Sequence, residues 1–179
     1  MKNVGYNNSV AVIGANSKAG KHIATAICKA YRVLLMDTDA MQTTTLANEI
    51  RNITQSPEAV ETLTCSKDAS WEADVIVLVV PVALQPAIAQ KIAEVATCKT
   101  ILQIISENTN HSSIQNLLPY SNVVSVTLHD TTAIVQGKNK VAVQLAIHLL
   151  SFTHWKIVEK KVYKLKENKQ QLNIHSYKK

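Results

Sequence analysis

Short apolar runs alternate with segments of helical periodicity along most of the chain. Residues 10–13 are apolar and rich in β-branched side chains, which is typical of a strand buried on both faces of a parallel sheet. In residues 22–31 apolar side chains recur every three or four positions, and this spacing predicts a helix. A second apolar run follows at residues 32–36. Residues 9–37 therefore predict one strand–turn–helix–strand unit.

The same alternation continues after this unit. We expect further strands at 60–65, 75–80, 100–105, 122–128, 140–143 and 155–162, and helices at 41–53, 86–97, 112–118 and 145–153. Residues 66–73 predict a loop that places Trp71 against the core. Strands and helices that alternate over short connections predict an α/β fold with a doubly wound, mostly parallel sheet.

The organisation expected from this pattern is one main domain with a short extension. Residues 1–150 form the α/β domain, and residues 151–179 form a basic strand and a short helix that complete or extend it. In residues 155–162 apolar side chains alternate with charged ones, which favours an edge strand with lysines on its open side.

The turn after the first strand contains only small or polar residues before Lys21. Its members are Gly14, Ala15, Asn16, Ser17, Lys18, Ala19 and Gly20. A helix N-terminus presents unpaired N–H groups and a partial positive charge, so a pyrophosphate can bind there where side chains are small. These seven residues are therefore candidate dinucleotide contacts, although the middle glycine of the usual fingerprint is missing. The alternative is a strand-to-helix turn that binds nothing.

Two further positions belong to the same candidate site. Asp37 ends the second strand about 20 residues after Gly14, the offset at which a carboxylate accepts the ribose hydroxyls of adenosine. A carboxylate there repels a 2′-phosphate, so we expect NAD rather than NADP. Val80 and Pro81 end the fourth strand at its carboxyl end, where open α/β sheets bind ligands.

Composition and charge exclude several classes of protein. A chain of 179 residues with 46% hydrophobic content can bury a sizeable core. The net charge of +6 lies entirely after Leu149, where 8 basic residues accompany 2 acidic ones, so it does not predict a nucleic-acid-binding face on the domain. The longest apolar run is interrupted by Pro81 and is too short to span a membrane. The N-terminus lacks the apolar segment of a signal peptide, and we expect a cytoplasmic protein.

No metal site is predicted. Cys28, Cys65 and Cys98 are odd in number and widely spaced, which favours buried free thiols over disulfides. The histidines at positions 111, 148, 154 and 175 share no metal-ligand spacing with one another or with the cysteines.

Four segments, taken in order, carry a resemblance to a known family: VAVIGANSKAGKHIA, DVIVLVVPVALQPAIAQKI, ILQIISENTN and NVVSVTLHD. Together they resemble the nucleotide-binding domain of prephenate dehydrogenase. Gly14 and Gly20 match the outer glycines of that family's first loop, and Val80 and Pro81 match its valine–proline pair. The resemblance implies a Rossmann-type NAD(P)-binding domain and oxidation of a small hydroxy-carboxylate with hydride transfer to NAD. It places His129 where the family has a histidine that hydrogen-bonds the substrate hydroxyl.

Three functions stay open at this point. The first is a prephenate dehydrogenase-like oxidoreductase in which His129 is the catalytic residue. The second is a degenerate dinucleotide-binding or regulatory domain without catalysis, since the family's helical dimerisation domain has no counterpart here and the chain's two arginines, Arg32 and Arg51, lie early. The third is another small-substrate NAD(P)-dependent reductase. In each case we expect a monomer, or a homodimer through the C-terminal segment.

Overall fold

The computed structural model describes residues 8–106 and 113–160. Its centre is one sheet whose strands are β1 (Ser9–Ile13), β2 (Arg32–Met36), β3 (Val60–Leu63), β4 (Val75–Leu78), β5 (Thr100–Ser106), β6 (Asn122–His129), β7 (Thr132–Gly137) and β8 (Lys156–Glu159). The strand order is β3-β2-β1-β4-β5-β6-β7-β8. Strands β1 to β6 are parallel, β7 runs antiparallel to β6, and β8 runs parallel to β7. The predicted doubly wound, mostly parallel sheet is confirmed.

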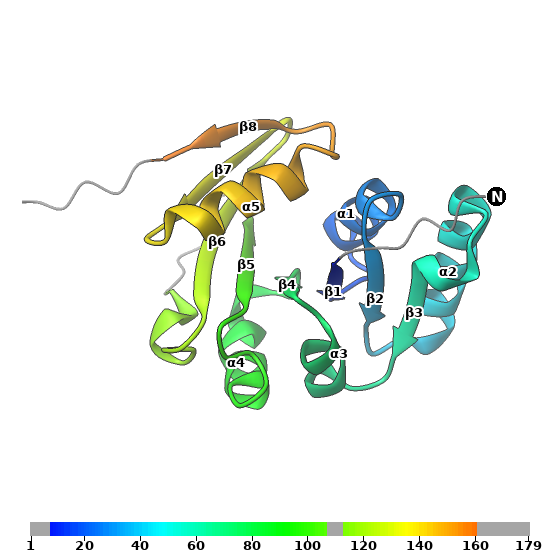
Figure 1. Cartoon of the computed structure of the whole chain (residues 1–179), viewed down its shortest axis with the longest axis horizontal. Helices are drawn as coiled ribbons and strands as arrows, with labels where there is room; N and C mark the ends of the chain where they lie inside the picture. Colours follow the sequence, from blue (N-terminus) through cyan, green and yellow to red (C-terminus); the bar gives the residue numbers. More distant parts are fainter. Residues whose placement is uncertain (1–7, 107–112, 161–179) are drawn as a thin grey trace, which may run out of the picture.

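Helices cover both faces of the sheet. They are α1 (Lys18–Ile27), α2 (Ala40–Thr54), α3 (Ser66–Glu72), α4 (Gln85–Ile92) and α5 (Lys140–Leu150), with short 3₁₀ turns η1 (Pro57–Ala59), η2 (Val82–Leu84) and η3 (Ile114–Asn116). Helices α1, α2 and α5 lie on one face and α3 and α4 on the other (Figure 1).

The apolar composition of the central strands follows from this two-sided covering. In β1, Val10 and Val12 pack under α1, while Ala11 and Ile13 pack against the opposite layer, and all four are fully buried. A strand covered on both faces has no solvent side, so its sequence shows a continuous apolar run rather than alternation.

One predicted strand near the C-terminal half of the sheet is wrong. Residues 140–143 begin α5 instead of forming a strand, because the side chain of Asn139 accepts hydrogen bonds from the N–H groups of Val141 (2.9 Å) and Ala142 (3.1 Å) and so caps a helix there. That helix also includes most of the segment expected at 145–153. The seventh strand is instead β7, which folds back onto β6.

Other boundaries differ as well. Residues 66–73 form helix α3 rather than a loop, and Trp71 is 70% exposed, so it does not cover the core. Helix α4 is shorter than the predicted 86–97, and the helix expected at 112–118 is reduced to η3. Strand β8 is confirmed as an edge strand, although shorter than predicted. The short helix expected toward the C-terminus falls outside the described residues.

None of the helices in the described part of the chain has the length and apolar character needed to cross a membrane.

Candidate functional site

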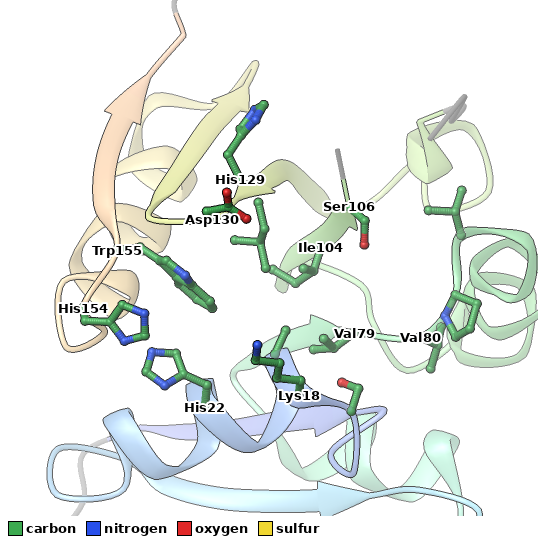
Figure 2. Close-up of a pocket in the computed structure, with 15 residues that line it drawn as sticks. Lys18, His22, Val79, Val80, Ile104, Ser106, His129, Asp130, His154 and Trp155 are labelled. Atoms are coloured by element: carbon green, nitrogen blue, oxygen red, sulfur yellow. The ribbon is translucent and has the colours of Figure 1, made fainter. Parts of the chain in front are cut away.

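A cavity of about 1010 Å³ lies at the point in the sheet, between β1 and β4, where the order of successive strands reverses. The chain moves outward from β1 to β3, then crosses to β4 and continues through β5 and β6. Open α/β sheets bind ligands at such a switch point, outside the carboxyl ends of the strands. The cavity is lined from the start of α1, from the ends of β4, β5 and β6, and from the residues just before β8 (Figure 2). The fold therefore creates a site where the sequence predicted one.

The two outer glycines of the first loop are required by close backbone contacts. Gly14 has a φ of +91°, and a Cβ atom there would lie 2.8 Å from both the carbonyl carbon and the carbonyl oxygen of Val79. A Cβ atom on Gly20 would lie 2.4 Å from the carbonyl oxygen of Gly14. The N–H of Val79 also donates to the carbonyl of Ile13 at 2.8 Å. Gly14 thus packs the loop directly against the end of β4, and Gly20 lets the start of α1 pack against the carbonyl of Gly14.

Ser17 occupies the position expected for the middle glycine and caps α1. Its hydroxyl donates to the carbonyl of Gly14 (2.8 Å) and accepts from the N–H of Gly20 (3.0 Å). First-turn N–H groups have no intrahelical partner, so those of Lys18 and Ala19 are the helix donors left for an anion. The side chains of Ser17, Lys18 and Ala19 line the cavity, whereas Gly14, Ala15 and Gly20 are buried beneath them.

Asp37 lies beside the same loop, at the end of β2. Its carboxylate accepts hydrogen bonds from the N–H groups of Asn16 (2.8 Å) and Thr38 (2.7 Å). The amide of Asn16 donates to the carbonyl of Asp39 (2.9 Å) and to the Thr43 hydroxyl (3.0 Å). These contacts fix the loop to the β2–α2 connection. The structure therefore brings Asp37 to the loop, although Asp37 does not line the cavity. Its role in binding a ribose stays a prediction.

Val80 and Pro81 line the cavity from the β4 side, and a buried amide holds their segment. The Gln85 side chain donates to the carbonyls of Val80 (3.1 Å) and Ile104 (2.8 Å) and accepts from the amide of Gln103 (2.8 Å). Both glutamines are fully buried. Sequence reasoning missed this pair, although a glutamine inside the apolar run of β5 was a visible signal.

His22, His154 and Trp155 form the wall opposite β4, and sequence reasoning missed them too. The ring centroids of His22 and His154 are 4.2 Å apart, and those of His22 and Trp155 are 4.8 Å apart. The Nε2 atom of His22 is buried and has no hydrogen-bond partner among the described residues. Burial, and secondly the nearby His154, lower the pKa of His22. His22 lies in a helix, whereas His154 and Trp155 precede the edge strand β8, so no local sequence pattern could have linked them.

His129 lies at the carboxyl end of β6, at the edge of the cavity. Its ring points away from Lys18 and His22 (Figure 2). It also borders a second hollow of about 550 Å³ over β6 and β7. The catalytic role of His129 stays a prediction.

Among residues 8–106 and 113–160, no three His, Cys, Asp or Glu side chains are grouped so that they could hold a metal ion. Of the three cysteines, Cys28 is buried, Cys65 is half-buried and Cys98 is exposed, so the expectation of buried thiols holds in full only for Cys28.

The fold of this chain is similar to that of known proteins, although its sequence is not. No protein-family model and no curated protein sequence matches the chain. Solved structures do match. A pyrroline-5-carboxylate reductase from Coxiella burnetii has a TM-score of 0.68 at 15% identity, over 88% of this chain and 60% of its own. The pyrroline carboxylate reductase of Plasmodium falciparum, solved with NADP bound, has a TM-score of 0.64 at 11% identity, over 87% of this chain and 58% of its own.

A third similar structure is the 3-hydroxyacyl-CoA dehydrogenase from Archaeoglobus fulgidus, with a TM-score of 0.63 at 17% identity, over 89% of this chain and 58% of its own. The chain thus spans somewhat more than half the length of these three proteins. At such identities the likeness shows the fold alone, and that fold is a Rossmann-type α/β domain. The predicted fold class is confirmed at this level.

Proposed function

We propose that this domain binds a nicotinamide dinucleotide and acts as an NAD(P)-dependent oxidoreductase domain. The observation that carries the proposal is the loop of residues 14–20. Gly14 packs it against Val79, Gly20 packs against the loop's own carbonyls, and the loop opens the N-terminus of α1 into the cavity. The cavity volume is sufficient for a ligand of this class, for which sites of roughly 300–1,000 Å³ are usual. The reductases and the dehydrogenase named above have the same fold, which supports the proposal.

The residues present fit such a cofactor in three places. The N–H groups of Lys18 and Ala19 would hold the pyrophosphate. Asp37 lies beside the loop, where a carboxylate accepts ribose hydroxyls. Val80 and Pro81 offer an apolar surface at the strand end for the nicotinamide. When bound, the cofactor accepts or supplies a hydride, and the chain's own residues bind it, orient it and exclude water.

The finer assignment is oxidation of a small hydroxy-carboxylate, as the resemblance to prephenate dehydrogenase implies, with His129 as proton acceptor. Support for it is limited to the motif match and to the location of His129 at the cavity edge. Reduction of another small substrate by the same domain is the second candidate, which the similar structures favour because two of them are pyrroline carboxylate reductases. A domain that binds the dinucleotide without catalysis is the remaining alternative.

A thermal-shift series with NAD, NADH, NADP and NADPH tests the proposal. A ligand at 100 times its dissociation constant adds about 2.7 kcal/mol to the free energy of unfolding. For a domain of this size we therefore expect the melting temperature to rise by roughly 5–10 °C with the preferred nucleotide. If none of the four nucleotides raises the melting temperature, the dinucleotide assignment is wrong.

We expect NAD or NADH to stabilise the protein more than the phosphorylated pair, because the Asp37 carboxylate repels a 2′-phosphate. Asp37→Asn removes the charge and keeps an oxygen for only one of the two N–H groups, of Asn16 and Thr38, that donate to the carboxylate. It should narrow the difference, and Asp37→Arg should reverse it. Asp68→Asn, on α3 away from the loop, is the matched control. A wild-type preference for NADPH of tenfold or more, about 1.4 kcal/mol, would show that the role given to Asp37 is wrong.

A further inference from the structure

The wall formed by His22, His154 and Trp155 has no part in holding a dinucleotide at the loop. Lys18 and His22 are four residues apart on α1, so their side chains lie on the same face of the helix. Figure 2 shows both on the cavity side of α1, with His154 and Trp155 facing His22 from the segment before β8. Two separate parts of the chain thus bring an amine and two imidazoles to one end of the cavity.

We propose that Lys18, His22 and His154 form a subsite for a small anionic group of the substrate, a carboxylate or a phosphate, and that this anion binds together with a proton. The assignment to the substrate rests on the proposed function. The anion subsite itself rests only on the cavity and on these three side chains.

The hydrogen-bonding state of His22 is the first argument. Its Nε2 atom is shielded from water by the surrounding structure and has no partner among the described residues. A buried polar atom without a partner typically costs about 1–3 kcal/mol, and a ligand oxygen placed there would remove that cost. His154 is exposed, so its ring is free to turn aside and admit the anion beside His22.

The charges around the cavity are the second argument. The His154 ring and Trp155, from the segment before β8, face His22, and Lys18 lies on the cavity side of the same helix as His22 (Figure 2). The Lys18 amine and the imidazoles are nitrogen donors. Of the described residues that line the cavity, Asp130 is the only acidic one, and it lies at the end of β6. An anion between Lys18 and the two imidazoles would therefore meet donors on three sides.

The same geometry couples the anion to a proton. Burial, and secondly the His154 ring 4.2 Å away, lower the pKa of His22, so the free protein favours the neutral ring. An anion beside the ring stabilises the protonated form and raises that pKa. Binding should therefore take up a proton, and affinity should increase as the pH falls.

The pyrophosphate of the dinucleotide is the other possible source of an anion, and position argues against it. Its donors, the N–H groups of Lys18 and Ala19, are in the first turn of α1, whereas His22 lies a full turn further along. Trp155 stands edge-on to His22 and provides an apolar wall for the rest of a small substrate. We expect the anion and the dinucleotide to bind together.

Isothermal titration with sulfate and with acetate, which keep their charge between pH 6 and 8, tests the subsite. We expect binding about tenfold tighter at pH 6 than at pH 8, with proton uptake seen as a difference between buffers of unequal ionisation enthalpy. His22→Gln should weaken binding about tenfold and remove most of the pH dependence. His148→Gln, an exposed histidine on α5, is the matched control and should change neither.

Proton NMR of the histidine rings gives a readout that does not depend on affinity. The pKa of His22 should rise when sulfate is added, and the ring signals of His148 should not respond to sulfate. Equal affinity in wild type and His22→Gln, or a His22 titration that sulfate leaves unchanged, overturns the proposal.

Saturating NAD distinguishes the two sources of the anion. Sulfate binding that persists in its presence supports a separate substrate subsite, and competition between the two assigns the anion site to the pyrophosphate and overturns the proposal. If NAD does not bind but sulfate binds through His22, the proposed function fails while the anion subsite stands. If NAD binds but neither sulfate nor acetate does, the anion subsite fails while the proposed function stands.

Discussion

Gly20→Val is expected to lower the free energy of unfolding by about 4 kcal/mol, because overpacking against fixed backbone exceeds the usual cost of roughly 1–3 kcal/mol. A Cβ atom at this position would lie 2.4 Å from the carbonyl oxygen of Gly14 and 2.9 Å from that of Ala15. Neither oxygen can move unless the whole loop moves away from β4. Urea unfolding, fitted with a common slope for wild type and variant, measures the loss.

Gly137→Val is the matched control for this prediction. There the nearest atom to an added Cβ is a methyl carbon of Val143, at 2.9 Å, and a side-chain end can turn away. Valine also suits a strand, so we expect a loss of only about 1 kcal/mol. Gly20→Val should in addition remove the stabilisation by NAD, since α1 must shift from its place against β1. Equal losses of stability in the two variants would contradict the role of Gly20.

The parallel half of the fold could be predicted because its pattern is local and strong. Each of β1, β2, β4 and β5 is a short apolar run covered on both faces, and β1, β2 and β4 are each followed by a helix or a turn of suitable composition. The prediction failed where the chain reverses. β6 and β7 are joined by Asp130 and Thr131 alone, a connection without the glycine that usually marks a two-residue hairpin turn. The strand was therefore placed at 140–143 instead of in β7.

The candidate site shows the same division between local and distant contacts. The loop of residues 14–20 and Asp37 belong to one βαβ unit, so their closeness follows from the motif. The contact of His22 with His154 and Trp155 depends on β8 joining the sheet beside β7, which in turn depends on the reversal that the sequence pattern did not reveal. The positions of these three side chains along the sequence therefore gave no indication that they are neighbours.

Gln85 shows how a distant contact can determine the shape of the site. Strand β4 pairs with β5 only as far as Leu78 and Gln103, while β5 continues to Ser106. Beyond that point the side of β5 that faced β4 has lost its partner strand, and the carbonyl of Ile104 is satisfied by the Gln85 amide instead. The same amide holds the carbonyl of Val80, so one buried side chain links the end of β5 to the segment that lines the cavity.

We expect Gln85→Met to lower the free energy of unfolding by about 4 kcal/mol. The buried carbonyl of Ile104, the part-buried carbonyl of Val80 and the Gln103 amide each lose a partner at roughly 1–3 kcal/mol, and such losses are only partly additive. Gln90→Met, an exposed position on the same helix, is the control and should change stability by less than about 0.5 kcal/mol. The double variant Gln85→Met with Gln103→Met should lose about 1–2 kcal/mol less free energy of unfolding than the sum of the losses in the two single variants. The reason is that the two side chains interact directly.

Ligand binding to the Gln85→Met variant shows whether Gln85 only stabilises the sheet or also positions the cavity wall. Without the Gln85 amide, the Val80 and Pro81 segment is no longer fixed to β5, so the surface offered to the nicotinamide becomes less ordered and the ligand must order it on binding. The thermal shift produced by the preferred nucleotide should therefore be smaller in Gln85→Met than in Gln90→Met, measured at the same ligand concentration. An unchanged shift in a variant that has lost stability would mean that Gln85 supports the sheet but does not position the cavity wall.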